Sequence, residues 1–288
     1  MTIPGVSATP TASIVIPTRG RAGYLDVALS SIEHQASAAG AEIIVVEDGE
    51  DPETRGVAAR HGTRLVSLDA RSGANAARNA GITAARSELL VFVDDDIEAS
   101  SGWLERLLGA ARSASDYDAF GGPIRPRLEG RGPRGCGREP PPITNLDLGD
   151  DDRDVALVWS ANMAIRRAAF ERVGASDETI RGRGEEEEWQ RRLTASGGRI
   201  RYVGGAAVVH RRAGADARMA ALARADYALG HSARRYDVRK HSAPSLAGEL
   251  RLLAGAVWHT LRRRCGFGPV MIAHALGRLR ELAAERTR

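Results

Sequence analysis

Three consecutive carboxylates, Asp94, Asp95 and Asp96, directly follow an unbroken apolar run at residues 89–93. Two unit charges about 4 Å apart repel by roughly 1 kcal/mol in water and by about 4 kcal/mol at a protein-like dielectric. A fold keeps such a cluster if a cation binds there or if the run is solvated. Carboxylate oxygens are hard ligands that suit Mg²⁺ or Mn²⁺. The alternative is an acidic helix start, because a helix is predicted to follow and its dipole favours negative charge there.

Two further acidic runs occur later in the chain, at residues 150–152 and 185–188. No strand is predicted to lead into residues 150–152, which favours a solvated loop there. Residues 185–188 open a predicted helix, where four carboxylates usually indicate a solvated start. Helical spacing lets only one or two of them face a cleft, while Trp189 and Leu193, four positions apart, mark the buried side.

Apolar segments that predict buried strands alternate with segments of helical spacing in the first part of the chain. The predicted strands are "ASIVIPT", "AEIIVVEDG", "TRLVSL" and "ELLVFV", and the predicted helices are "AGYLDVALSSIEHQ", "PETRGVAARHG", "SGANAARNAGITAARS" and "SSGWLERLLGAARSA". This alternation indicates an α/β fold with a parallel sheet covered on both faces. Ligands of such sheets bind at the carboxyl ends of the strands. Polar residues at these ends are Thr18, Arg19, Glu47, Asp48 and the run 94–96.

The pattern changes in the second part of the chain. Residues 123–154 are rich in Pro, Gly and charge, which predicts a flexible loop or lid. A strand and a helix are predicted in "VALVWSANMAIRRAAFERVG", a helix in "GEEEEWQRRLTASGG" and one or more strands in "RIRYVGGAAVVH". From about residue 215 the chain is predicted to be helical, with amphipathic helices at 246–262 and 269–284.

Composition and charge limit the functional classes. The two cysteines, Cys136 and Cys265, lack the spacing of a zinc site or a disulfide framework, which suits a reducing compartment. The N-terminus lacks the basic start and apolar core of a signal peptide, and no apolar stretch approaches the roughly 18 residues of a spanning helix. Residues 215–288 carry 14 Lys and Arg against 6 Asp and Glu, a net charge of +8, and the rest of the chain carries −4.

The basic region 215–288 predicts a charged partner, either an anionic membrane surface or an acidic acceptor, with a solvated amphipathic cap as the alternative. Residues 262–264 are arginines close to Leu252, Leu253, Val257 and Trp258, an arrangement that suits an anionic leaflet. No motif typical of nucleic-acid binding supports such a partner. We expect a cytoplasmic protein with peripheral contact at the inner face of the cell membrane, and a homodimer is left open.

Six stretches, in order along the chain, resemble motifs of the family 2 glycosyltransferases, enzymes with the GT-A fold. They are "SIVIPTRGRAGYLDVALSSI", "EIIVVEDGEDPET", "SGANAARNAGI", "LLVFVDDDIEASSGWLERLL", "WSANMAIRRAAFERVGASDETI" and "GEEEEWQRRLTASGGRI". The third is similar to the family's Ala-Arg-Asn-x-Gly helix, the fourth to its Asp-x-Asp strand and the last to its Gly-Glu-Asp-x-Glu helix. The expected organisation is an N-terminal extension at 1–11, a GT-A glycosyltransferase domain at 12–214 and a basic helical region at 215–288.

The resemblance implies a GT-A fold, with a Rossmann-like, mostly parallel sheet, helices on both faces and a C-terminal helical tail. It implies an inverting enzyme that moves a sugar from a nucleoside diphosphate sugar, expected to be a UDP-sugar, to a hydroxyl acceptor. Asp94 and Asp96 would bind Mn²⁺ or Mg²⁺, with Asp95 near the ribose or the metal. Asp48 would contact the base, although Glu47 stands where an aspartate is commoner. The other residues expected at the donor nucleotide are Pro17, Thr18, Arg19 and Arg78.

The family's Glu-Asp pair maps to Glu185 and Glu186, and by position Glu186 would be the base that takes the acceptor's proton. The family usually has aspartate there, so Glu186 is a departure from the pattern. His210 ends the apolar stretch "AAVVH" and would be a third metal ligand, with a structural histidine as the alternative. Trp159 and Asn162 would line the acceptor pocket, with a place in the core as the alternative.

Two other classes of function fit parts of the sequence. A nucleotidyltransferase on a similar sheet would need a basic, glycine-rich loop after the first strand, and "PTRGRAG" has two arginines and two glycines. A non-catalytic protein that binds nucleotide sugars would need only the fold, and the departure at Glu186 leaves this open. The acceptor could be a cell-envelope glycan, a lipid-linked molecule or a secondary metabolite.

Overall fold

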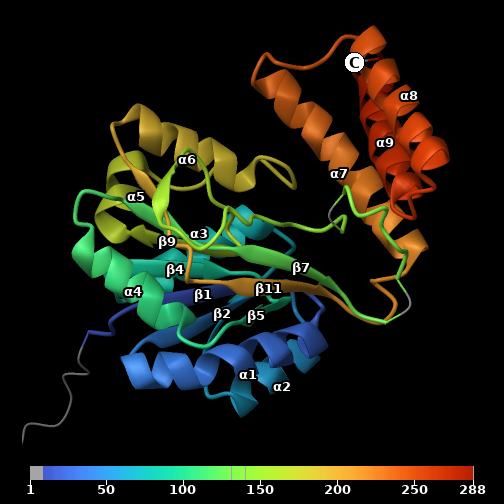
Figure 1. The fold of residues 1–288 in the computed structure, drawn as a ribbon. Helices are drawn as coiled ribbons and strands as arrows, with labels where there is room; N and C mark the ends of the chain where they lie inside the picture. Colours follow the sequence, from blue (N-terminus) through green and yellow to red (C-terminus); the bar gives the residue numbers. More distant parts are fainter. Residues whose placement is uncertain (1–8, 131, 140, 288) are drawn as a thin grey trace, which may run out of the picture. The chain divides into compact units, whose positions relative to one another are not determined.

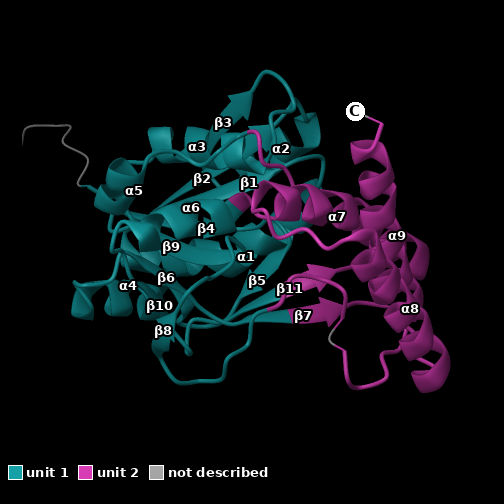
Figure 2. Ribbon diagram, turned by 90° about the horizontal axis from the view of Figure 1, so that it is seen from above, with its two compact units in different colours: residues 1–125, 146–178, 186–209 teal, residues 126–145, 179–185, 210–288 magenta. Residues whose placement is uncertain are grey.

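The computed structural model describes residues 9–130, 132–139 and 141–287, so most of the predicted N-terminal extension, residues 1–8, lies outside the described residues. The chain divides into two compact units (Figure 2). The first unit comprises residues 1–125, 146–178 and 186–209, and the second comprises residues 126–145, 179–185 and 210–288. The domain boundary expected at residue 214 remains a prediction.

An eight-stranded sheet is the centre of the first unit, with the strand order β3-β2-β1-β4-β9-β6-β10-β8. Neighbouring strands from β3 to β4 are parallel, as are β6 and β10, whereas β9 is antiparallel to both of its neighbours and β8 is antiparallel to β10. The mostly parallel sheet is therefore confirmed. Its strands are β1 (Ser13–Thr18), β2 (Glu42–Asp48), β3 (Arg64–Leu68), β4 (Leu89–Val93), β6 (Ala119–Gly121), β8 (Arg153–Val155), β9 (Asn162–Arg166) and β10 (Ile200–Tyr202).

Helices cover both faces of this sheet, as the near-continuous apolar strands require. Figure 1 shows α1, α2 and α4 on one face and α3, α5 and α6 on the other. Alternate residues of β1 serve the two cores, because Ile14 packs with Leu25 of α1, whereas Val15 packs with Ala77 of α3. The helices are α1 (Ala22–Ala39), α2 (Pro52–Arg60), α3 (Ala74–Ala84), α4 (Trp103–Ser113), α5 (Arg167–Val173) and α6 (Glu185–Ala195).

Helix α3 lies unusually close to the sheet because it carries a glycine where it crosses β1. A Cβ atom on Gly81 would lie 2.3 Å from a methyl carbon of Val15, so any larger residue would force the helix away. Two asparagines of α3 then hold the segment before α6. The Asn75 amide donates to the carbonyl of Asp177 at 2.8 Å, and the Asn79 amide donates to the carbonyl of Ser176 at 3.0 Å.

The segment 123–154 contains more regular structure than the loop or lid that the sequence predicts. Strand β7 (Ile124–Leu128) occupies its start and β8 its end, and an isolated bridge joins Ile124 to Leu146. Strand β7 belongs to a three-stranded sheet of order β5-β11-β7, with β5 at Ile97–Ala99 and β11 at Val208–Arg212. The prediction of an irregular excursion was wrong at both ends, because pairing with distant strands overrides a composition rich in Pro and Gly.

The second unit contains three long helices, α7 (Met219–Arg239), α8 (Leu246–Arg263) and α9 (Gly268–Glu285), and α9 packs against the other two. The two predicted amphipathic helices are confirmed as α8 and α9. Glu249 is completely buried between Arg234 and Arg278, with N···O distances of 3.0 and 2.8 Å. Burial alone would raise the pKa of Glu249, but the two guanidinium groups outweigh it and lower that pKa. Part of the basic charge is therefore paired inside the unit.

The second unit also brings together the two cysteines, which are far apart in the sequence, and a histidine. Cys136, Cys265 and His259 each offer one donor atom, and these atoms lie within 4.8 Å of one another. Spacing in sequence does not report proximity in a fold, so the distance between the two cysteines along the chain does not by itself exclude a shared site. Among the described residues, no helix is long and apolar enough to cross a membrane.

Candidate functional site

The carboxylates of Asp94, Asp95 and Asp96, called the carboxylate cluster below, lie where β1 and β4 end side by side. The Thr18 hydroxyl, at the end of β1, donates a hydrogen bond to Asp95 at 2.7 Å. The Arg21 guanidinium, at the start of α1, forms an ion pair with Asp95 at 3.0 Å and another with Asp96. Parallel neighbouring strands thus bring one cation from the β1–α1 connection onto the acidic end of β4.

Burial governs the protonation of Asp95. Asp95 is only 4% exposed, and this desolvation raises its pKa to about 7, opposed by Arg21 and reinforced by Asp96 and Asp94. Burial also acts against the charged form of Arg21, but Asp95 and Asp96 outweigh it and raise the pKa of the guanidinium. Arg21 therefore stays protonated and compensates part of the negative charge of Asp95 and Asp96.

Asp94 and Asp96 fit a hard divalent cation. One carboxylate oxygen of each lies within 4.8 Å of the other. Two oxygens on opposite sides of one Mg²⁺ are about 4 Å apart, so a small side-chain movement would let both bind the same ion. The donor set of carboxylate oxygens suits Mg²⁺ or Mn²⁺ better than softer metals.

The predicted third ligand, His210, is on β11 and belongs to the second unit. Its Nδ1 lies 3.2 Å from the carbonyl oxygen of Thr144. A carbonyl can only accept, so Nδ1 is the donor in this contact. In metal-binding histidines, a hydrogen bond of this kind at one nitrogen orients the other.

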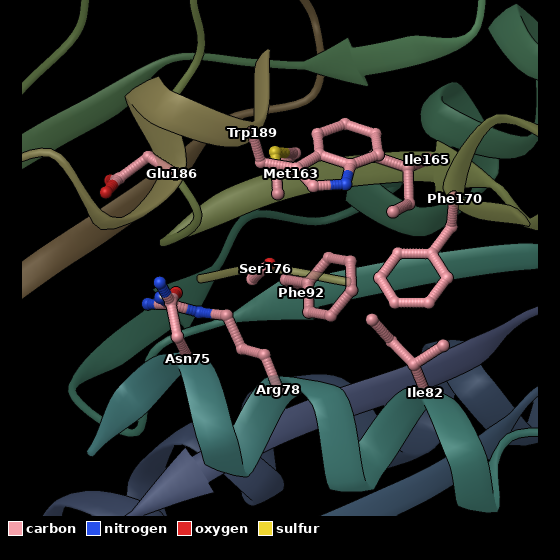
Figure 3. A pocket seen from close by; sticks show the side chains of 10 residues that line it. All are labelled: Asn75, Arg78, Ile82, Phe92, Met163, Ile165, Phe170, Ser176, Glu186 and Trp189. Carbon is pink, nitrogen blue, oxygen red and sulfur yellow. The ribbon is translucent and has the colours of Figure 1, made fainter. Parts of the chain in front are cut away.

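A small cavity lies between α3 and α6 in the first unit. Figure 3 shows Glu186, Arg78 and Asn75 at its polar end and Phe170 and Ile82 at its apolar end. The Arg78 guanidinium donates to the Asn75 side chain at 3.2 Å and lies 3.9 Å from a carboxylate oxygen of Asp94. Arg78 thus connects this cavity to the carboxylate cluster. The full lining is Asn75, Arg78, Ile82, Phe92, Met163, Ile165, Phe170, Ser176, Glu186 and Trp189.

The two candidate bases differ in their surroundings. The Glu185 carboxylate accepts a hydrogen bond from the backbone N–H of Gly182 at 2.6 Å, so it serves the turn that precedes α6. Glu186 instead lines the cavity that contains Arg78. As the helical spacing predicted, Trp189 and Leu193 are buried, and Glu188 forms a surface ion pair with Arg192 at 2.8 Å.

The two acidic residues at the end of β2 are both hydrogen-bonded within the fold. Glu47 is fully buried and accepts from the Ser67 hydroxyl at 2.7 Å and from Arg55 at 3.1 Å. Asp48 accepts from the backbone N–H groups of Ser72 and Gly73, at 2.6 and 3.2 Å. Glu47 therefore braces the β2–α2 connection, and Asp48 orders the turn that leads into α3.

Asn162 is completely buried, and both polar atoms of its amide are hydrogen-bonded within the fold. Its oxygen accepts from the Trp103 indole at 2.8 Å, and its nitrogen donates to the carbonyls of Pro123 and Ala206, at 3.1 and 2.7 Å. We therefore leave Asn162 out of the acceptor site. Trp159 is half-buried, and it packs against the core on the α1 face of the sheet.

Sequence reasoning overlooked Arg21. It singled out Arg19, which is exposed, whereas Arg21 is the residue that pairs with the cluster. The signal was present as the two arginines of "PTRGRAG", but only the direction in which α1 starts decides which one turns toward β4. Pro17, the remaining residue expected at the donor, is half-buried near the end of β1.

The fold is shared with known glycosyltransferases. A mannosyltransferase from Pyrobaculum calidifontis, solved with GDP-Man and Mn²⁺, aligns with a TM-score of 0.61 over 95% of this chain and 88% of its own, at 16% identity. GalNAc-T7, solved with UDP, GalNAc and Mn²⁺, aligns with a TM-score of 0.55 over 72% of this chain and 44% of its own, at 18% identity. At such identities the likeness shows the fold alone, and it is the GT-A fold.

The sequence places the chain more narrowly. Residues 13–174 match the family described as Glycosyl transferase family 2, and the chain belongs to that family. It is also similar to the pre-mycofactocin glycosyltransferase of Mycobacterium tuberculosis, with 31% identity over 211 residues. That match covers 69% of this chain but only 42% of the mycobacterial protein, so the chain corresponds to less than half of that relative's length.

The raised pKa of Asp95 predicts a pH-dependent cost to stability. Since the folded-state pKa lies above the unfolded value, the ionised carboxylate opposes folding above about pH 7, and the cost disappears as the pH falls toward 4. With chelator present, Asp95→Asn should raise the midpoint of thermal unfolding at pH 8, and this gain should shrink at pH 5. Differential scanning fluorimetry at several pH values would measure it.

The matched control is Asp151→Asn, since Asp151 is an exposed residue of another acidic run. It should leave the midpoint unchanged at every pH. An Asp95→Asn protein less stable than the parent at pH 8 would contradict the prediction and indicate that Arg21 compensates the buried charge.

Proposed function

We propose that this chain is an inverting, metal-dependent glycosyltransferase that moves one sugar from a nucleoside diphosphate sugar to a hydroxyl acceptor. The observation that carries the proposal is the carboxylate cluster at the adjoining ends of β1 and β4, in a chain of glycosyl transferase family 2. Support for the donor class comes from the two similar structures, which contain GDP-Man and UDP. A UDP-sugar is the donor that we expect.

Asp94 and Asp96 are the proposed ligands of a divalent cation, Mn²⁺ or Mg²⁺, with His210 as the third. Their oxygen donors fit such an ion, and the two similar structures contain Mn²⁺. When bound, the cation would neutralise the negative charge that grows on the departing diphosphate. Arg78, which lies 3.9 Å from Asp94, adds a fixed positive charge at the same edge of the sheet.

The donor nucleotide is proposed to lie along the carboxyl ends of β1, β2 and β4. Asp48 accepts hydrogen bonds from two backbone N–H groups, which holds its carboxylate at the end of β2 for a base. Thr18 orients Asp95 toward the ribose or the metal. We keep Pro17 and Arg19 as residues near the donor, and we assign Glu47 to positioning because it has no exposed surface.

Glu186 is the proposed general base. It takes the proton of the acceptor hydroxyl while that oxygen attacks C1 of the sugar. The new bond joins the acceptor oxygen to C1, the bond from C1 to the diphosphate oxygen breaks, and its electron pair leaves with the nucleoside diphosphate. Because attack comes from the face opposite to the leaving group, the configuration at C1 inverts. Trp159 is kept as a residue of the acceptor side.

Helix α8 exposes an apolar stripe that we propose rests on an anionic membrane surface. Leu246, Leu250, Val257 and Leu261 recur at i, i+4, i+11 and i+15, which is one helix face, and Trp258 borders that face at i+12. The stripe consists of Leu246, Leu250, Val257, Trp258 and Leu261, and Leu261 is 72% exposed. Exposed arginines at 251 and 262–264 accompany it, and their charge complements anionic headgroups. A lipid-linked acceptor would suit such docking.

The donor proposal predicts metal-dependent stabilisation by one nucleoside diphosphate. At a ligand concentration of about 100 times Kd, the free energy of unfolding should rise by about 2.7 kcal/mol. Thermal unfolding with UDP, GDP, dTDP and CDP, each with and without Mn²⁺, measures the effect and identifies the base. Asp96→Asn should abolish it, while Asp151→Asn should not. If no diphosphate shifts the midpoint with or without Mn²⁺, the cluster is not a donor site.

The base proposal predicts that Glu186→Gln lowers the turnover rate by about 10²- to 10⁴-fold, because an amide cannot accept the proton. Release of nucleoside diphosphate from the stabilising donor would be measured, together with donor binding, which should persist. Glu188→Gln on the outer face of α6 is the control and should retain activity. An inactive Glu185→Gln beside an active Glu186→Gln would move the base to Glu185.

The docking proposal predicts binding to vesicles of phosphatidylglycerol and phosphatidylcholine at low salt, and weaker binding to phosphatidylcholine alone. Replacing Trp258 and Leu261 by serine should reduce co-sedimentation by at least about tenfold, given roughly 1.5–3 kcal/mol for each buried large side chain. Leu252→Ser, on another face of α8, is the control. A stripe variant that keeps vesicle binding, or that instead dissociates a dimer of the parent protein, would refute docking.

A further inference from the structure

A cluster of soft metal donors lies in the second unit. It differs from the proposed donor site in its ligand atoms and in the part of the chain that carries them. The Cys136 sulfur is 3.4 Å from Nε2 of His259, and one donor atom of Cys265 lies within 4.8 Å of both. His259 is in the last turns of α8, Cys265 follows α8 in the turn that leads to α9, and Cys136 is in the segment 132–139. Three separate parts of the chain thus converge on one point, called the thiol–imidazole cluster below.

Two glycines hold the segments that carry the cysteines in contact. The N–H of Gly266 donates to the carbonyl of Arg134 at 3.0 Å, and a Cβ on Gly266 would lie 2.1 Å from that same oxygen. A Cβ on Gly135 would lie 2.6 Å from the ring of Phe267. Each glycine is the immediate neighbour of a cysteine, so the close approach of the two backbones places both thiols on the same spot.

The three residues of the thiol–imidazole cluster are partly or fully shielded from solvent, as the ligands of a bound ion usually are. Cys265 is 3% exposed, and Cys136 and His259 are half-buried. A sharp turn after α8 places Cys265. Arg264 ends the helix one residue before Cys265 and adopts a left-handed conformation with φ of 49°. A non-glycine residue in that conformation is uncommon, which indicates that the surrounding contacts fix the turn.

We propose that Cys136, His259 and Cys265 bind one Zn²⁺ ion. Zinc takes two thiolates and an imidazole in tetrahedral geometry, with Zn–S of about 2.3 Å and Zn–N of about 2.0 Å, so its ligand atoms lie roughly 3.5–4 Å apart. The 3.4 Å between the Cys136 sulfur and Nε2 of His259 is close to the lower end of this range. The fourth position is left to water or another ligand. Soft sulfur ligands separate this site from the hard oxygen donors of Asp94 and Asp96.

The ion would act as a cross-link within the second unit. Cys136 lies in the stretch 123–154, which is rich in Pro and Gly, and the metal would link this stretch to the α8–α9 turn. Binding to the folded chain alone converts metal affinity into folding stability. Loss of zinc should therefore loosen the segment 132–139 without touching the cluster at β4.

The test begins with the full-length protein purified under reducing conditions without chelator. Elemental analysis should find about one equivalent of zinc. After removal of the metal, titration with Co²⁺ should give the visible bands of tetrahedral cobalt and a near-ultraviolet thiolate charge-transfer band. Cys136→Ser and His259→Gln should lose the stoichiometric zinc and weaken or abolish both bands. Circular dichroism would confirm that these variants fold, which is expected because Cys136 is half-buried on a loop.

Two controls separate this site from other histidines and from the donor metal. His34→Ala changes an exposed histidine of α1 and should retain the zinc and the cobalt spectrum. Asp96→Asn should retain both as well, even where it abolishes stabilisation by a nucleoside diphosphate with Mn²⁺. The failure of either site is thereby distinguishable from the failure of the other.

Three results would overturn the proposal. The reduced protein could bind no zinc and give no thiolate–cobalt band. The band could persist unchanged in Cys136→Ser. Mass spectrometry could find Cys136 and Cys265 joined in a disulfide that survives reductant and excess zinc, and the cluster would then be a covalent cross-link rather than a metal site.

Discussion

The repulsion among three adjacent carboxylates at the buried end of β4 is the constraint on which the first unit depends. Water would screen these charges if they were exposed, but Asp95 and Asp96 are almost completely buried. An ion pair from Arg21 and a hydrogen bond from Thr18 stabilise the cluster. Both residues reach it only because β1 and β4 are adjacent and parallel. The cost that remains is typical of a site arranged for a ligand, where stability is given up for binding.

The other half of the candidate site is organised by α3. Close packing of this helix at Gly81 sets its distance from the sheet, and Asn75 and Asn79 fasten the segment that leads to α6. Arg78, between these asparagines, then lies between the cavity and Asp94. Helix α3, which in sequence is a short run of small and polar residues, therefore makes different contacts on its different faces. One face packs, one ties a loop and one supplies charge.

The charges of the two units are handled differently. In the second unit, buried Glu249 is enclosed by Arg234 and Arg278, so its charge is compensated inside the fold. A buried pair of this kind contributes little net stability but costs about 3–5 kcal/mol when one partner is removed. In the first unit, Arg21 pairs with Asp95 and Asp96, and Arg78 lies 3.9 Å from a carboxylate oxygen of Asp94. The enclosure of Glu249 by two arginines fits a structural role, whereas three carboxylates in a row at the end of a strand fit a site for a cation.

Much of the fold was predictable because its signals are local. Apolar runs, helical spacing and strand-end polar residues depend on near neighbours, and they placed β1, β2, β4, α8 and α9 correctly. The same reasoning placed the carboxylate cluster at a strand end, where parallel sheets bind ligands. Strands β7 and β8 escaped prediction because each exists only through pairing with a distant partner.

What the sequence by itself determined is the α/β alternation, the family and the residue types available for chemistry. Tertiary structure alone decided that Arg21 rather than Arg19 meets the cluster, and that Asn162 is a fully bonded core residue. It alone brought Cys136 beside His259, across 123 positions of sequence. The physical reason is the same in each case. Local patterns fix which face of an element is apolar, but the partner of a polar side chain depends on how distant elements pack.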